Sequence, residues 1–403
     1  MNSFYKQGPK TLYELQEQVS NGNLSWLHRI SYYSNRVTGS SAYWRAKRQE
    51  AFSWINFHLG HGNGVPSFFI TLSCAEYHWK DIERLIVDRN IAGGLPAPDM
   101  SKGRVGLIND FTIVVQEYFQ AQVKVWLDTV GRELLKIKHY WLRFEFAPSR
   151  GQIHAHMLVI CDNKEIMRKC HELRENKPKL AKFLGAWLKE TIGMSASLPE
   201  AHKTVDTKTE PHPSGSNFSD VPEDRQKLDS TLCHVCCHSH NCSKYCMNQR
   251  KFIPKTETVE QKKRKVCRCG AGVEVTAGEC NTPGFKIRKE PCIVRDLRGF
   301  DRVDMPRNHR RITQCATYVA QGWRGNCDIQ YLIYTSDPDN IDASDVSRVT
   351  NYVVSYSCKG SETEMEQKLS MKDLILAAKE EEGDIKDVRR IAKRLLNDCS
   401  KKE

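Results

Sequence analysis

Two neighbouring stretches in which apolar and polar residues alternate constrain the fold of this chain most strongly. HYWLRFEF covers 139–146, IHAHMLVICD covers 153–162, and APSRGQ between them has the residues of a turn. Successive side chains of a strand point to opposite faces, so each stretch predicts a strand with one buried face. The short connection predicts that the two strands pair as an antiparallel hairpin. The chain is therefore expected to contain an antiparallel sheet.

The second strand of this hairpin carries His154 and His156, which share one face because they are two residues apart. With the turn centred near residues 149 and 150, Glu145 lies opposite His154 and Arg143 lies opposite His156. Two imidazoles and a carboxylate on one sheet surface are typical of an open divalent-metal site. Such a site suits Mg²⁺ or Mn²⁺, with water and phosphate oxygens as the other ligands. The alternative is a pair of surface histidines that bind no metal.

A helix is predicted over 344–359, SDVSRVTNYVVSYSCK, roughly 200 residues after the histidines. Tyr352 and Tyr356 are four apart and share one stripe of it, which Lys359 joins. A phenol with a pKa of about 10 is a weak nucleophile, and a metal at the phosphate with a nearby cation would activate it. The alternative interpretation is that both rings pack in the core. Ser344 or Asp345 is expected to cap this helix.

Nine of the sixteen cysteines fall between Cys233 and Cys292. The N-terminus has no apolar signal core, so the chain is expected to stay in a reducing compartment, where clustered cysteines indicate metal binding. One four-ligand zinc site is predicted from His240, Cys242, Cys246 and Cys267. The further candidate ligands are Cys233, Cys236, Cys237, Cys269, Cys280 and Cys292, enough for a second tetrahedral zinc, although the spacing does not divide them between the sites. Such sites are usually structural.

The formal net charge of +12 favours a polyanionic partner, although a soluble basic protein would have the same charge. The basic stretches include KKRK at 262–265 and the candidate DNA-binding residues Arg307, Arg310, Arg311 and Arg324. Aromatic residues that could stack on unpaired bases include Phe285, Phe300 and Trp323. The chain has no phosphate-loop motif and no apolar run long enough to span a membrane.

These motifs, in this order, resemble the Rep-like HUH endonuclease domain of Helitron transposases over roughly residues 10–375. VPSFFITLSCAEYHW resembles the first strand motif, and RFEFAPSRGQIHAHMLVI resembles the HUH motif. HSHNCSKYC with CRCGAG resembles the zinc-binding insert, and MPRNHRRI with WRGNCDIQYLIY resembles the segment before the tyrosine helix. NYVVSYSCKG resembles the two-tyrosine motif. Many relatives have lysine just before the second tyrosine, where this chain has Ser355.

The resemblance implies an α+β fold, with an antiparallel sheet of about five strands, flanking helices, a helical N-terminal region and a zinc-binding insert. It places Glu145, His154 and His156 at the catalytic metal and turns the tyrosine stripe toward it. The expected divisions are 1–60, helical region; 61–202, first part of the nuclease core; 203–232, linker; 233–312, zinc insert and basic stretch; 313–360, second part of the core; and 361–403, charged helical tail.

The implied activity is nicking of single-stranded DNA, at transposon ends and target, through a 5′-phosphotyrosine intermediate. Strand transfer in rolling-circle transposition would follow, in the nucleus. Full-length relatives also carry a helicase domain, whose motifs are absent here, so the chain is expected to be an excised nuclease part or a degenerate copy. Two alternatives remain: a non-catalytic zinc-stabilised DNA-binding module or transposon relic, and a metal nuclease that uses water as its nucleophile.

Overall fold

The structure is a computed structural model, which describes residues 41–94, 96, 98, 101, 103–146, 152–198, 209–239, 287–295, 300–309 and 312–358. The chain divides into two compact units, one of residues 62–349 and one of residues 1–61 together with 350–403. No helix in the described part of the chain is both long and apolar enough to cross a membrane.

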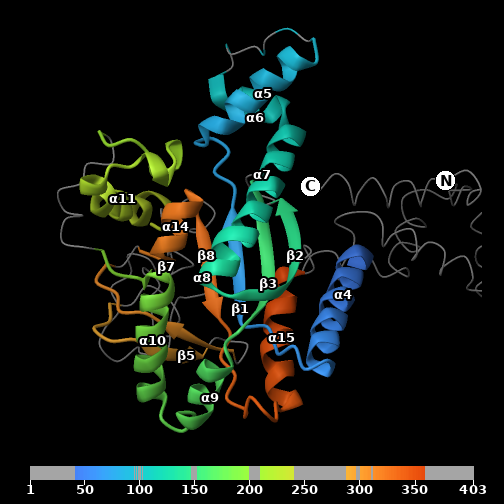
Figure 1. Cartoon of the computed structure of the whole chain (residues 1–403), viewed down its shortest axis with the longest axis vertical. Coiled ribbons are helices and arrows are strands. Elements are labelled where there is room, and N and C mark those ends of the chain that lie inside the picture. The colour runs from blue at the N-terminus through green and yellow to red at the C-terminus, as the bar shows by residue number, and fades with distance from the viewer. Residues whose placement is uncertain are drawn as a thin grey trace, which may run out of the picture. The chain divides into compact units, whose positions relative to one another are not determined.

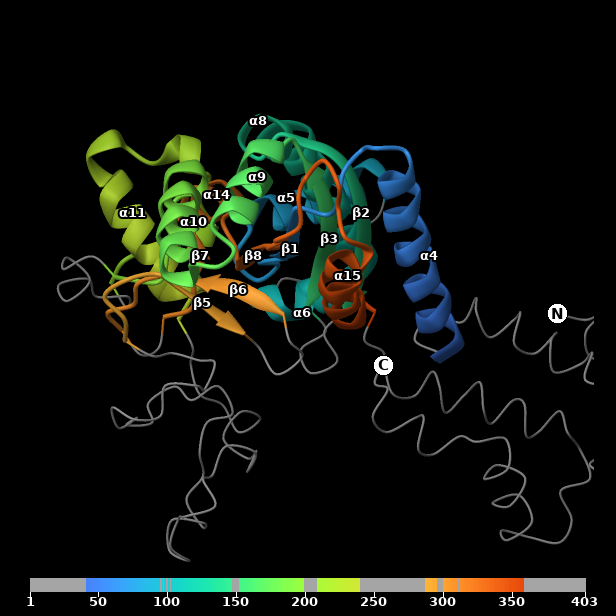
Figure 2. The ribbon, with the colours of Figure 1, turned by 90° about the horizontal axis from the view of Figure 1, so that it is seen from below.

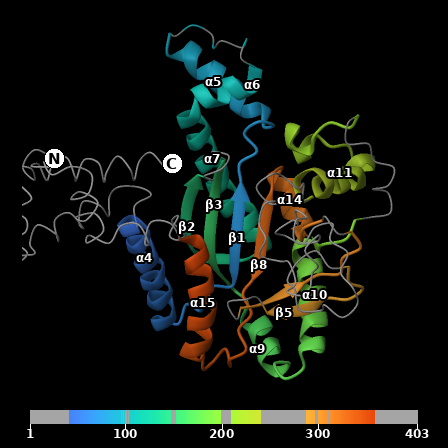
Figure 3. The same ribbon diagram turned by 180° about the vertical axis from the view of Figure 1, so that it is seen from behind.

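The larger unit is built on a four-stranded antiparallel sheet with the order β2-β3-β1-β8, which Figure 3 shows. Its strands are β1 (Phe68–Ser73), β2 (Ile137–Phe146), β3 (Ile153–Cys161) and β8 (Cys327–Tyr331). The predicted α+β class is confirmed. The expected number of about five strands was too high for this sheet, because the other described strands pair outside it: β4 (Met194–Ser195) with β7 (Cys315–Ala316), and β5 (Cys292–Arg295) with β6 (Asp301–Asp304).

The predicted hairpin is confirmed with its register. Glu145 of β2 pairs with His154 of β3, and Arg143 pairs with His156. On the other side of β3, Ser73 of β1 pairs with His154, and β1 in turn pairs with β8. A register shifted by one residue would turn the histidines to the opposite face, so the alternation of buried residues determines this pairing.

One face of the sheet packs on the long helix α7 (Thr112–Trp126), which runs in front of the sheet in Figure 1. Phe119 and Val123 of α7 join Ile70 and Met157 of the sheet in one buried cluster. The sequence predicted one long helix or two over 110–137. The structure has α7, followed by a π-helical turn η2 (Leu127–Gly131) and a short α8 (Arg132–Leu134). This apolar face leaves the opposite face for the polar side chains.

Further helices surround the sheet in the larger unit. Those before and after the hairpin are α5 (Lys80–Ala92), α6 (Gly103–Asp110), α9 (Lys164–Glu172) and α10 (Lys177–Ile192). The β5–β6 pair lies beside α10 (Figure 2), where a Cβ on Gly185 would come within 2.9 Å of the Pro291 side chain. Glycine is therefore needed at this close approach.

The segment predicted as a linker, 203–232, has regular structure in its described part. It contains three 3₁₀ turns and a short helix: η4 (Pro213–Gly215), η5 (Phe218–Asp220), η6 (Glu223–Arg225) and α11 (Gln226–Leu232). The π-helical turn η7 (Cys233–Cys237) follows, and α14 (Thr317–Trp323) comes before β8. Polar composition indicated a linker here, but Leu232, Thr231 and Asp229 are buried and tie the segment to the larger unit.

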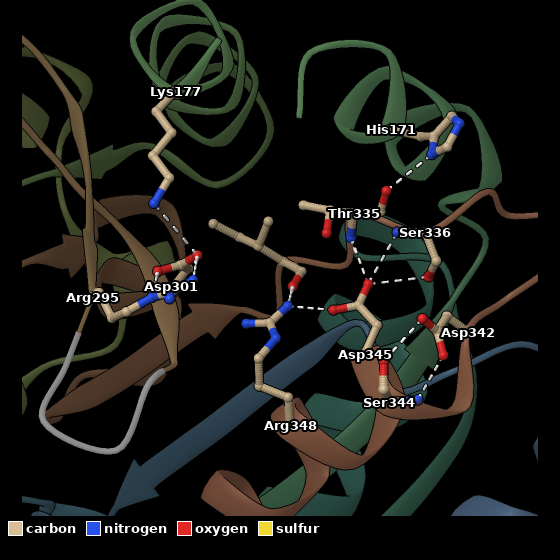
Figure 4. A network of polar contacts seen from close by, with 11 residues as sticks. His171, Lys177, Arg295, Asp301, Thr335, Ser336, Asp342, Ser344, Asp345 and Arg348 are labelled. Atoms are coloured by element: carbon tan, nitrogen blue, oxygen red, sulfur yellow. Dashed lines mark hydrogen bonds and ion pairs between the residues drawn. The ribbon is translucent and has the colours of Figure 1, made fainter. Parts of the chain in front are cut away.

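The tyrosine helix, α15, runs from Ala343 to Ser357. Asp342 caps it by accepting a hydrogen bond from the Ser344 backbone N–H at 2.8 Å, so the expected cap at Ser344 or Asp345 was two or three residues late. Asp345 does not cap the helix. Its carboxylate accepts hydrogen bonds from the backbone N–H groups of Thr335 and Ser336 and so stabilises the preceding loop, as Figure 4 shows.

The described part of the smaller unit consists of the end of α15, from Thr350 on, and the helix α4 (Ser41–Gly60). Ala51 and Ile55 are the buried apolar residues of α4. The expected helical N-terminal region is thus seen over 41–60, and residues 1–40 lie outside the described residues.

Candidate metal site

The histidine pair lies on the polar face of the sheet, and hydroxyl groups of β1 contact both rings. His154 Nδ1 lies 2.8 Å from Ser73 Oγ, and His156 Nδ1 lies 3.0 Å from Thr71 Oγ1. His156 is buried and stacks on the Phe69 ring, with 5.8 Å between the ring centres. His154 is half-buried. Both rings are therefore held at Nδ1, the nitrogen that metal-binding histidines commonly give to an outer partner.

Glu145 reaches across the hairpin to one of these histidines, His156. Its Oε2 lies 3.1 Å from His156 Nε2 and 3.0 Å from Arg143 Nη2. Burial raises the pKa of Glu145, but the hydrogen bond from His156 and the charges of Arg143 and the two histidines outweigh burial, so the pKa is lower than its ordinary value. The carboxyl group is therefore ionised at neutral pH, as a metal ligand must be.

The donor set fits an open site for a hard divalent cation. Ligands at 2.0–2.1 Å in an octahedron lie about 3 Å from their neighbours, which matches the 3.1 Å between His156 Nε2 and Glu145 Oε2. The ring centre of His154 is 6.4 Å from that of His156. Among the described residues no group of three His, Cys, Asp or Glu side chains is arranged to hold a metal ion, so the structure brings His156 and Glu145 together but does not complete a three-ligand site with His154.

Arg143 is the positively charged residue that pairs with Glu145 on the polar face of the sheet. It is buried, and its ion pair with Glu145 is the interaction that a metal ion would have to share or replace. Removing a buried charge from water is costly unless a partner compensates it, so Arg143 fixes the Glu145 carboxylate at the site.

The sequence did not identify Thr71 and Ser73 as residues of this site, although the T-x-S pattern in FFITLS places both hydroxyls on one strand. The alternation shows that both hydroxyls share a face, but not which strand lies beside them. Asp328 of β8 also lies in this row, because it pairs with Thr71. Thr71 is 85 residues from His156 and 257 residues from Asp328, so these strand pairings come from the tertiary fold and cannot be predicted from local sequence patterns.

The tyrosines occupy the end of α15, in the smaller unit. Tyr352 is half-buried, and its neighbours Val353 and Val354 are buried. Tyr356 belongs to the helix backbone, but its side chain lies outside the description, as does Lys359. The expected arrangement of the stripe relative to the metal pair stays a prediction.

Four of the predicted zinc ligands are described, and one of them, Cys237, is half-buried at the end of η7 with its sulfur 3.8 Å from Ser214 Oγ. Cys233 is buried in η7 near Asp229 and Arg324. Cys236 is half-buried in the same turn, two residues before His238. Cys292 is the first residue of β5, and the guanidinium group of Arg288 lies 2.6 Å from its sulfur. The other six candidate ligands lie outside the described residues: His240, Cys242, Cys246, Cys267, Cys269 and Cys280. The zinc sites stay predictions.

A further thiol, Cys327, lies beside these residues. Its sulfur is 3.8 Å from His238 Nε2. The hydrogen bond with Cys315 and the interaction with His238 lower the pKa of Cys327 to about 6, against the effect of burial.

Two of the four predicted DNA-binding arginines are buried. Arg324 Nη1 donates to both carboxylate oxygens of Asp229 at 2.8 Å, and the other two guanidinium nitrogens donate to Ser216. Arg307 pairs with Asp304 at 3.2 Å. These contacts give both arginines a structural role; that either one also contacts DNA stays a prediction. Arg310 and Arg311 lie outside the described residues.

The suggested base-stacking role of two aromatic residues was wrong. Phe300 is fully buried, and Trp323 is buried with its Nε1 donating to the Ser73 carbonyl at 2.9 Å. Neither ring face is open to a base. Phe285 lies outside the described residues.

Comparison with known families gives one match, between residues 4–159 and the model of the Helitron helicase-like domain at the N-terminus. This segment is therefore similar to a Helitron helicase-like N-terminal domain. The Helitron-like segment includes β1, β2 and most of β3, and with them Thr71, Ser73, Glu145 and both histidines. It suggests a role related to Helitron transposases and is consistent with nuclease or transposase activity. No curated protein and no solved structure gives a match.

Proposed function

We propose that this chain is a metal-dependent HUH endonuclease of a Helitron-type transposon, which nicks single-stranded DNA through a 5′-phosphotyrosine intermediate. The observation that carries the proposal is the convergence of His156 Nε2 and Glu145 Oε2 at 3.1 Å, with His154 in the same row and within the Helitron-like segment.

Glu145, His154 and His156 would hold Mg²⁺ or Mn²⁺. When bound, such an ion supplies charge neutralisation at the scissile phosphate. The lowered pKa of Glu145 supports this assignment, because the carboxylate is charged at neutral pH without further change. Arg143, buried behind Glu145, is a positive charge that keeps the carboxylate directed to the histidines.

The nucleophile in this proposal is Tyr352 or Tyr356. Its phenolic oxygen forms a bond to phosphorus, the bond from phosphorus to the 3′ oxygen breaks, and the phenol proton is balanced by the proton that the 3′-hydroxyl gains. One ester replaces another, so the reverse step can rejoin strands. The second tyrosine would accept a second strand for transfer, and Lys359 would favour the phenolate.

The segments that surround this site would bind structural zinc and DNA. The cysteine-rich insert would bind one or two structural zinc ions, with thiols such as Cys233 among the ligands. Basic residues, Arg310 and Arg311 among them, would neutralise DNA phosphates and make binding depend on salt. The protein would act in the nucleus on transposon ends and target DNA, in cooperation with a helicase domain.

A non-catalytic, zinc-stabilised DNA-binding module is the second candidate. The Arg143–Glu145 ion pair favours it, because a hairpin with its own charge balance needs no metal to be stable. This candidate predicts DNA binding that is indifferent to His154→Ala.

A single assay separates these functions. A labelled single-stranded oligonucleotide is incubated with the protein and Mn²⁺, and products are resolved under denaturing conditions. The proposal predicts cleavage with a covalent protein–DNA adduct, both lost in His156→Ala. Cleavage without an adduct would indicate water as the nucleophile, and binding without cleavage would favour the non-catalytic module.

A further inference from the structure

We infer that the turn of residues 323–326, which joins α14 to β8, is a clamp that positions the histidine row by holding the end of β1 at Ser73. The inference rests on the proposed function for its purpose, but the clamp itself can be tested without DNA or metal. Residues of the turn act through Ser73, whose hydroxyl oxygen lies 2.8 Å from His154 Nδ1.

Both main-chain polar groups of Ser73 are bonded to this turn. The Ser73 N–H donates to the Asn326 carbonyl at 2.9 Å, and the Ser73 carbonyl accepts from Trp323 Nε1 at 2.9 Å. The next residue, Cys74, donates to the Ile153 carbonyl at 3.0 Å and so continues the pairing of β1 with β3. Ser73 therefore lies between the turn and the strand that carries both histidines.

Gly325 allows the turn to approach Ser73 closely. A Cβ at this position would lie 3.0 Å from the Ser73 carbonyl oxygen and 3.1 Å from Trp323 Nε1. These distances are shorter than ordinary van der Waals contact, so the neighbouring atoms would have to move by a few tenths of an ångström. Because one neighbour is a main-chain oxygen and the other is the indole that bonds it, a methyl group here would displace Ser73 or weaken its bond.

A second tryptophan fixes the turn from the side of β1. Trp79, which lies just before α5, donates from Nε1 to the Arg324 carbonyl at 3.0 Å. The rings of Trp79 and Trp323 meet edge to face with 5.3 Å between their centres, an arrangement that aromatic pairs favour. Both indoles are buried, so water cannot readily replace the bonds that they make. Each indole thus bonds the main chain of the segment that carries the other.

The clamp lies closer to one histidine than to the other. Ser73 is opposite His154 in the strand register, whereas Thr71, two residues further from the turn, is opposite His156. A shift of the Ser73 main chain would move its hydroxyl, and we therefore expect His154 to respond more than His156. Displacement of a reactive group by about 1 Å can lower a rate by about 100-fold, so a small shift at His154 would affect catalysis.

The test compares two variants of the clamp in the full chain. Gly325→Ala adds a methyl group against the Ser73 carbonyl, and Trp323→Phe removes the indole N–H that bonds it. NMR of the histidine Cε1–Hε1 groups without metal or DNA, assigned with His154→Gln and His156→Gln, reports the surroundings of each ring. Both clamp variants should move the His154 signal, and further than the His156 signal. Trp323→Phe decides the test if Gly325→Ala does not fold.

Two matched variants separate positioning from a general loss of stability. Gly322→Ala adds the same methyl group one residue before Trp323, at a position with no other atom within 4 Å. Trp126→Phe shortens another buried indole, whose Nε1 has no hydrogen-bond partner among the described residues. Neither variant should move the His154 signal.

The rate of adduct formation is the second measurement. With a single-stranded oligonucleotide and Mn²⁺, the clamp variants should lower the rate at saturating DNA by about tenfold or more, because the reacting groups are displaced. The DNA concentration that gives half the maximal rate should stay the same, because the clamp acts on the histidine row.

A His154 signal that stays in place in both clamp variants would overturn the inference, as would an equal movement in either matched variant. An unchanged rate of adduct formation despite a displaced His154 signal would also overturn it. If the wild type forms no adduct but the His154 signal responds as expected, the nuclease proposal fails and the positioning role of the turn stands.

Discussion

Glu145 Oε2 of β2 lies 3.1 Å from His156 Nε2 of β3, across a hairpin that buries Arg143 behind the carboxylate. Glu145 and His156 are diagonal neighbours, because Glu145 lies directly opposite His154 in the register of the two strands. The carboxylate thereby connects His156 with the guanidinium group of Arg143. Ion pairing and metal binding would use the same carboxylate oxygens.

Replacement of Glu145 by Gln should weaken metal binding while preserving the hairpin. The amide has nearly the same shape but lacks the charge that compensates Arg143 and attracts a cation. We expect Mn²⁺ affinity to fall by more than about tenfold, the lower end of the effect of losing a partner at a metal site. Isothermal titration with Mn²⁺ measures it. Glu133→Gln, on α8, is the matched control, and an equal loss of affinity in that variant would contradict the assignment.

Glu145 should also make stability depend on pH in the acid range. Its pKa is lowered in the folded protein, since the histidine and arginine interactions outweigh burial. Its stabilising contribution is therefore complete above the unfolded value of about 4.3 and is lost as the pH falls through the folded value. The difference in unfolding free energy between wild type and Glu145→Gln, measured by urea denaturation, should shrink from pH 7 to pH 3. A constant difference over that range would show that the carboxylate is not stabilised by its charge.

His234 should give a second pH dependence, at higher pH. Burial, followed by the charge of His238, lowers the pKa of His234 to about 4. An unfolded histidine has a pKa of about 6.5, so the unfolded state takes up a proton first and stability falls from about pH 6.5 to pH 4. Denaturation midpoints of His234→Gln should vary less with pH over this interval than those of the wild type. An identical pH slope for the two proteins would be inconsistent with a buried neutral imidazole.

The Arg324–Asp229 pair should be a structural link rather than a DNA contact. Both side chains are buried, and Arg324 closes α14 with a left-handed backbone conformation at φ +57°. Asp229→Asn leaves the buried guanidinium without its counter-charge and should cost about 3–5 kcal/mol of unfolding free energy. Glu290→Gln, which breaks the exposed pair with Lys182, should cost less than about 1 kcal/mol. Similar losses in the two variants would contradict the buried role.

The sequence was sufficient for the hairpin and its register, because alternation and the short turn are local signals. Glu145 could be placed opposite His154 for this reason. Thr71 and Ser73 could not be assigned to the site, because β1 joins β3 from 85 residues away in the case of Thr71 and His156. Arg307, Arg324, Phe300 and Trp323 look like surface candidates by residue type alone, and only the tertiary packing shows that they are buried.

The helix predicted over 344–359 agrees with α15 within two residues at each end, but the predicted capping residue was wrong. Asp342, Ser344 and Asp345 are all good capping residues, and their order does not show which one begins the helix. Asp345 instead binds the Thr335–Ser336 loop, a contact that Figure 4 shows and that requires the loop to fold back onto the helix.

The covalent DNA link is the most direct test of the proposed nuclease. The protein is incubated with a single-stranded oligonucleotide and Mn²⁺, digested with trypsin and analysed by mass spectrometry. Cleavage after Arg348 and Lys359 releases residues 349–359, which contain both Tyr352 and Tyr356. We predict that this peptide carries the nucleotide, and that the Tyr352→Phe, Tyr356→Phe double variant forms no adduct. An adduct that persists in the double variant, or a wild-type protein that cuts DNA without any adduct, would contradict the account.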